Sequence, residues 1–157
     1  MTEVNGLRLA YRGFVTGLAG GYVWAAIAML LASLASGDAL APLRPFAAAL
    51  SPFASSPEVA FVLGLAVVQL GGAFIGMVFA YFFARFFTVR ATLAVAAPIV
   101  ALLTWGLIAA AFTRDVDAAI FAGSAAPILA TLGYGLFLAA GVPVRGDVLR
   151  YSGSPST

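Results

Sequence analysis

The chain has 157 residues, of which 63% are hydrophobic and 9% are charged, with a formal net charge of +2. Soluble globular domains are closer to about half apolar and about one-quarter charged. The composition therefore excludes a nucleic-acid-binding domain, a disulfide scaffold and a disordered chain. It indicates instead an integral membrane protein whose main partner is the lipid bilayer.

Three chemically important residue types are missing: the sequence contains no Cys, no His and no Lys. Without Cys there are no disulfides, no Cys-ligated iron–sulfur cluster and no c-type haem attachment. Without His the usual ligand of haem and transition metals is absent, and without Lys a Schiff base with retinal or pyridoxal is impossible. We therefore expect no catalytic residues, no metal site, no cofactor and no enzymatic activity.

Four uncharged apolar runs follow one another along the chain, at residues 14–35, 59–83, 91–112 and 118–140. A helix needs roughly 20 residues to cross the hydrocarbon core of a bilayer, and each run meets that length. Isolated strands would leave backbone groups unpaired in lipid, so the spans are expected to be helical. The sequence predicts an all-α, four-transmembrane-helix bundle forming one domain over residues 1–145, followed by a flexible cytoplasmic tail at 146–157.

The arginines predict which way the spans point. Six of the eight lie near the N-terminus, in the connection between spans two and three, or near the C-terminus: Arg8, Arg12, Arg85, Arg90, Arg145 and Arg150. By the positive-inside rule both termini are expected in the cytoplasm. The absence of Lys beside abundant Ala, Gly and Arg suggests a GC-rich bacterial source, and hence the bacterial inner membrane. An alternative makes the first span a cleaved signal peptide, although its apolar stretch exceeds the usual length of about 7–15 residues.

The connections between the spans differ in length. Residues 36–58 form the longest one, and residues 46–50 within it are expected to be either a short helix on the outer membrane surface or irregular loop. The connection between spans two and three is very short, which predicts a tight antiparallel hairpin of those two helices.

Glycines recur at four-residue spacing on the first two spans. Such rows let helix backbones approach closely, which is a main source of helix association in lipid. We expect the two spans to pack through these rows, or alternatively one row to face a partner protein. The rows include Gly13, Gly17 and Gly21 on the first span and Gly64, Gly72 and Gly76 on the second.

Gln69 is the most polar side chain at membrane depth. A buried amide needs hydrogen-bond partners, so we expect a buried polar cluster with hydroxyl groups from the third and fourth spans. The alternative is that Gln69, together with Thr104 and Tyr134, lines a polar pathway. The expected partners are Thr104, Ser124, Thr131 and Tyr134.

Three local features of the later spans carry less information. Pro98 and Pro127 are expected to bend their helices, because proline removes a backbone hydrogen bond. Residues 131–135, Thr-Leu-Gly-Tyr-Gly, resemble the selectivity filter of potassium channels. Too few apolar residues follow them to form the inner helix that a filter requires, so a packed helix is expected. The aromatic run at residues 79–87 fits an interfacial anchor or, alternatively, a surface for a lipid, quinone or carotenoid.

Three functions are compatible with these features. The first is a non-catalytic accessory subunit or interaction protein in a larger membrane complex, or in a self-associated one, because the chain combines small-residue faces with no catalytic groups. The second is an oligomeric permease or channel for small solutes or ions, although no ionisable residue lies within a span. The third is a membrane protein that binds a lipid or a pigment in an aromatic groove.

Overall fold

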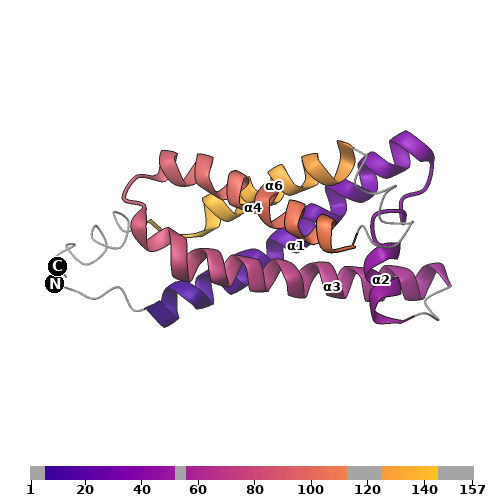
Figure 1. Cartoon of the computed structure of the whole chain (residues 1–157), viewed down its shortest axis with the longest axis horizontal. Helices are drawn as coiled ribbons and strands as arrows, with labels where there is room; N and C mark the ends of the chain where they lie inside the picture. The colour runs from indigo at the N-terminus through magenta and orange to yellow at the C-terminus, as the bar shows by residue number, and fades with distance from the viewer. Residues whose placement is uncertain (1–5, 52–55, 113–124, 145–157) are drawn as a thin grey trace, which may run out of the picture.

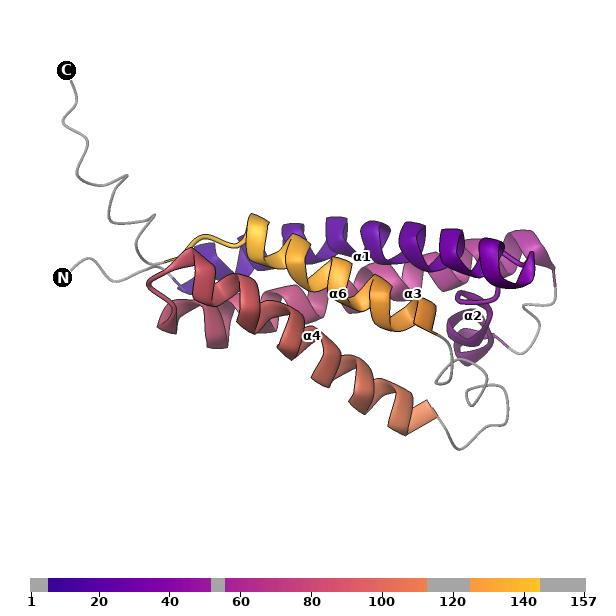
Figure 2. The same cartoon turned by 90° about the horizontal axis from the view of Figure 1, so that it is seen from above.

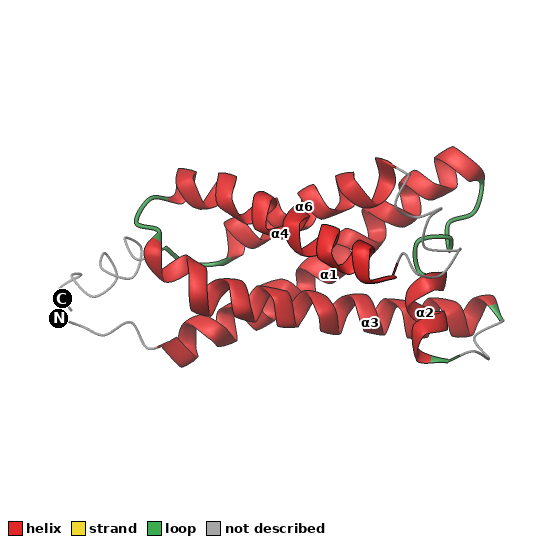
Figure 3. Ribbon diagram, in the orientation of Figure 1, coloured by secondary structure: helices red, strands yellow, loops and turns green. Residues whose placement is uncertain are grey.

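In this computed structural model the described residues are 6–51, 56–112 and 125–144, and they form five α-helices and no strand (Figure 3). The helices are α1 (Gly6–Ser36), α2 (Arg44–Leu50), α3 (Pro57–Val78), α4 (Arg90–Phe112) and α6 (Ala125–Gly141) (Figure 1). Beyond α3 the helix continues as a π-helical segment, η1 (Phe79–Phe83), and one 3-10 turn, η2 (Ala84–Phe86). The predicted all-α class is confirmed for this part of the chain.

Three helical segments are long and apolar enough to cross a membrane: Gly6–Ser36, Pro57–Phe83 and Arg90–Ile108. The first begins earlier than the predicted residue 14. Its 31 residues extend over about 46 Å, more than the roughly 30 Å of a hydrocarbon core. Two turns that contain Arg8 and Arg12 therefore belong to the same helix as the apolar run.

The fourth predicted span, 118–140, is described only from Ala125 onward, as the 17 residues of α6. Its first seven residues, like the predicted tail at 146–157, lie outside the described residues. The expected bend at Pro127 stays a prediction, because Pro127 is the third described residue of α6 and the residues before Ala125 lie outside the described ones. Pro98, in contrast, lies inside α4.

The closest helix contact joins α1 to α3, which run antiparallel (Figure 1). A Cβ atom at Gly17 would collide with the carbonyl oxygen of Gly72, and one at Gly72 would lie 2.7 Å from the carbonyl oxygen of Gly17. One turn away, a Cβ at Gly13 would collide with the backbone of Gly76. At the other end, a Cβ at Gly21 would lie 2.9 Å from Cα of Gln69. The two backbones thus touch along three turns.

Gly64 does not take part in this contact, although it belongs to the same glycine row of α3. A Cβ there would lie 2.5 Å from the carbonyl oxygen of Leu43, the residue that precedes α2. The helical alternative for residues 46–50 is correct, and α2 packs on α3 with Leu43 and Ala47 buried. The glycine at position 64 therefore makes room for the connection between α1 and α3, while α1 contacts the rest of the row.

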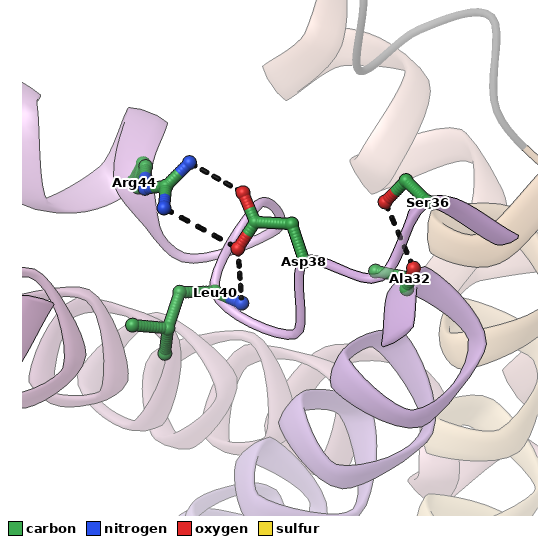
Figure 4. A network of polar contacts seen from close by, with 5 residues as sticks. All are labelled: Ala32, Ser36, Asp38, Leu40 and Arg44. Atoms are coloured by element: carbon green, nitrogen blue, oxygen red, sulfur yellow. Dashed lines mark hydrogen bonds and ion pairs between the residues drawn. The ribbon is translucent and has the colours of Figure 1, made fainter. Parts of the chain in front are cut away.

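A polar turn holds α2 in place (Figure 4). Helix α1 ends where Gly37 adopts a positive φ of 75° and its N–H donates to the carbonyl oxygen of Ser33. The Asp38 carboxylate then accepts hydrogen bonds from the backbone N–H of Leu40 and from both terminal nitrogens of Arg44. This arrangement fixes the direction in which the chain enters α2.

The predicted hairpin of spans two and three is wrong. The link between η2 and α4 is short, yet α4 makes its extensive contact with α6 and diverges from α3 (Figure 2). A Cβ at Gly135 of α6 would lie 2.5 Å from Cα of Pro98, so α6 presents a small residue where α4 approaches it most closely. Helix α6 also packs on α1 and hence lies between α1 and α4.

We expect Gly17→Ala to lower the free energy of unfolding by about 1–3 kcal/mol, because the added methyl group collides with the α3 backbone. Gly106→Ala is the matched control, since a Cβ at Gly106 has no neighbour within 4 Å. It should leave stability unchanged or raise it by up to about 1 kcal/mol through helix propensity. Reversible unfolding in detergent micelles, followed by circular dichroism, measures both. Equal effects of the two substitutions would contradict the backbone contact.

Candidate functional site

A half-open cavity of about 200 Å³ lies among the helices of the bundle. All five described helices contribute to it, and none of its lining side chains carries a charge. The lining consists of Gly21, Trp24, Phe46, Val67, Val68, Gly71, Gly72, Ile75, Ala101, Trp105, Ile108, Thr131 and Tyr134. This cavity is the candidate functional site of the protein.

Three aromatic side chains from three different helices meet at the cavity. Trp24 of α1 lies with its ring centre 5.6 Å from that of Trp105 of α4 and 5.9 Å from that of Phe46 of α2. Phe46 and Trp105 are 6.4 Å apart. Separations of this size are favourable for aromatic pairs. The two tryptophans are the only ones in the chain, so its whole tryptophan content lies at this site.

The polar atoms of the lining are engaged with the protein. Trp24 Nε1 donates a hydrogen bond of 3.0 Å to Thr131 Oγ1, which in turn donates to the carbonyl oxygen of Pro127 at 2.7 Å. The Tyr134 hydroxyl donates to the carbonyl oxygen of Gly72 at 2.6 Å. These bonds tie α6 to α1 and to α3, and they leave the cavity with a surface that is almost entirely hydrocarbon.

The structure places the members of the expected polar cluster apart. Thr131 and Tyr134 line the cavity, whereas Thr104 donates to the carbonyl oxygen of Val100 in its own helix. Gln69 lies beside Gly21 at the α1–α3 contact, and its buried Nε2 atom has no hydrogen-bond partner. The expected interhelical hydrogen bond of Gln69 is therefore not formed within the described residues. Ser124 lies outside them.

The two glycines of the motif that resembles a channel filter, Gly133 and Gly135, have packing roles. Residues 131–135 lie within the regular helix α6. Gly135 faces Pro98 of α4, and a Cβ at Gly133 would lie 2.6 Å from the side chain of Ile27 of α1. The helical interpretation of this motif is confirmed.

The sequence pattern did not identify Phe46 or Gly71 as lining residues. Phe46 reaches the cavity only because α2 folds back onto α3. Gly71 stands outside the four-residue glycine row, and a Cβ there would have no neighbour within 4 Å. The one sequence feature that could have indicated this cavity is the pair Trp24 and Trp105, because the two residues lie toward the same end of their spans.

Comparison with protein-family models, with curated proteins and with solved structures gives no match to this chain.

We expect Tyr134→Phe to lower the free energy of unfolding by about 0.5–2 kcal/mol, because it removes the hydrogen bond between α6 and the Gly72 carbonyl group. Tyr22→Phe is the control, since Tyr22 is exposed on α1 with 56% of its surface accessible. The measurement is unfolding of both variants in the same detergent. A loss of stability as large for Tyr22→Phe as for Tyr134→Phe would show that the hydrogen bond contributes nothing specific.

Proposed function

We propose that this chain is a non-catalytic inner membrane protein that binds an apolar molecule in its central cavity. The observation that carries the proposal is the cavity itself: about 200 Å³, walled by hydrocarbon and aromatic rings, with its hydroxyl and Trp24 indole groups bonded to the protein. An apolar ligand makes no hydrogen bonds and therefore gives none up when it enters this cavity. A polar ligand would lose its hydrogen bonds and find few partners there.

The size of the cavity supports a ligand, or part of one, at least as large as a benzene ring. An engineered apolar cavity of about 150 Å³ in another protein binds benzene or xenon and excludes water. The present cavity exceeds that volume. Filling it with hydrocarbon would restore dispersion contacts that the lining side chains otherwise lack.

A permease for polar solutes finds less support. The lining contains no charged group, and of the three expected pathway residues it includes Tyr134 but neither Gln69 nor Thr104. The role of accessory subunit in a larger complex stays a prediction, which is compatible with ligand binding but gains no specific support from the cavity. The non-catalytic assignment is supported by the lack of Cys, His and Lys in the sequence.

We further propose four membrane crossings, with α6 and the residues before it forming the fourth, and with both termini in the cytoplasm. Three features meet at one end of the bundle: the start of α1, the η2–α4 link and the end of α6 (Figure 1). At this end Arg90 donates a hydrogen bond of 3.0 Å to the carbonyl oxygen of Ala140, and Arg8 and Arg12 lie in the first turns of α1. Because α1 supplies one wall of the cavity, we propose that it is retained in the mature protein.

The topology is testable because the natural chain has no cysteine. We expect a single cysteine introduced by Ser154→Cys to react with a membrane-impermeant maleimide only after the inner membrane is permeabilised. We expect Ser55→Cys to react in spheroplasts with an intact inner membrane, since it lies in the predicted external connection. Labelling of both positions from the same side would require an even number of crossings between them, in place of the predicted three, and would contradict the predicted topology.

Ligand binding is testable with a small apolar probe. We expect bromobenzene to quench the tryptophan fluorescence of the detergent-solubilised protein in a saturable manner, because its heavy atom would contact Trp24 and Trp105. Gly71→Leu should weaken this binding at least tenfold, since a leucine side chain at that position fills the cavity without a backbone collision.

The matched control is Gly106→Leu, which adds the same side chain to an open position of α4 that does not line the cavity. It should leave the dissociation constant of bromobenzene unchanged within about twofold, since Gly106 is not a lining residue and a Cβ there meets no atom of another helix within 4 Å. Absence of saturable quenching in the natural protein, or equal loss in both variants, would overturn the proposed function.

A further inference from the structure

The cavity has walls from two helices that are adjacent in sequence but do not pack on each other. Val67 and Gly71 of α3 lie on one side, and Trp105 and Ile108 of α4 lie on the other. Helix α4 makes its extensive contact with α6 instead of α3. The space between α3 and α4 is therefore one part of the cavity wall that has no extensive helix–helix contact.

The outer rims of this space are strongly apolar and exposed. On α3, Leu70 and Phe74 have 65% and 62% of their surface accessible, and on α4 Leu103 and Leu107 have 65% and 74%. In a helix long and apolar enough to cross a membrane, such side chains face lipid tails. Gly71 lies between Leu70 and Phe74 along α3 and has no neighbour where its Cβ would be. On α3 the cavity lining therefore includes a residue without a side chain, placed next to exposed apolar side chains.

On α3, the lining residue Gly71 also lies near the middle of its membrane-spanning segment. Gly71 is 14 residues from Pro57 and 12 residues from Phe83, the two ends of its apolar segment. At 1.5 Å per residue these separations are about 21 Å and about 18 Å. The ends of lipid acyl chains meet at this depth in a bilayer, whereas headgroups lie at its surfaces.

We propose that the ligand of the cavity is the terminal part of an acyl chain of a bilayer lipid, which enters sideways between α3 and α4. This proposal rests on the proposed function and specifies its ligand. The headgroup stays outside at the membrane surface, so the protein needs no polar site for it at the depth of the cavity. The indole N–H of Trp24 and the hydroxyl groups of Thr131 and Tyr134 are engaged within the protein. A quinone ring, whose carbonyl oxygens accept hydrogen bonds, matches this lining less well than a hydrocarbon chain does.

The tryptophans provide the test. In the Trp105→Phe variant Trp24 is the sole tryptophan, and it is only 6% exposed, so ordinary surrounding lipid reaches it poorly. The variant is reconstituted into vesicles of phosphatidylcholine brominated either near the chain end or near the glycerol. We expect chain-end bromine to quench Trp24 at least twice as strongly as bromine near the glycerol. Gly71→Leu in the same background should reduce that quenching at least by half, and Gly106→Leu should not.

Three results are distinguishable. Quenching of Trp24 by bromobenzene in detergent, without quenching by chain-end bromine in vesicles, would overturn the acyl-chain proposal and leave the proposed function standing. Quenching by neither would overturn both. Strong quenching by chain-end bromine that Gly71→Leu does not reduce would show that lipid reaches Trp24 by another route, and would also overturn the proposal. Should Trp105→Phe fail to fold, the natural protein with both tryptophans at the cavity is measured in the same vesicles against Gly71→Leu and Gly106→Leu.

Discussion

The direct contact between the backbones of α1 and α3 is the constraint on which the remaining structure depends. Lipid tails are as apolar as leucine, so burial of hydrocarbon does not drive helices together in a bilayer, and close packing becomes a principal source of association. At Gly17 and Gly72 no side chain separates the two helices. Because this face of α3 packs on α1, only its other faces can contact α2 and the surrounding lipid.

The cavity is a consequence of how the other helices complete the bundle. Gly135 allows α6 to approach Pro98 of α4, and α6 in turn packs on α1. Helix α4 is thereby held beside α6 and away from α3, although only a short link joins it to the end of the α3 segment. Aromatic rings from three helices occupy part of the space that results, and the remainder stays open.

The hydrogen bonds of the cavity wall determine what the cavity can accept. A polar group buried away from water is costly unless it is paired, and Thr131 meets this requirement by accepting from Trp24 and donating to the Pro127 carbonyl group. The same bonds that stabilise the bundle therefore remove polar groups from the cavity surface. An almost entirely apolar lining is physically consistent with the proposed ligand from the bilayer.

The sequence by itself determined the helical class, the three long apolar segments and the glycine row at the α1–α3 contact, because these follow from local length, hydropathy and spacing. It also determined the absence of Cys, His and Lys chemistry. Only the tertiary structure decided that Gly64 contacts Leu43, that α4 packs on α6, and that Trp24 pairs with Thr131 while Gln69 does not. Most faces of these helices are apolar, so hydropathy does not distinguish a face toward lipid from a face toward another helix. Steric fit between particular side chains and backbones makes that distinction, and it depends on all the helices together.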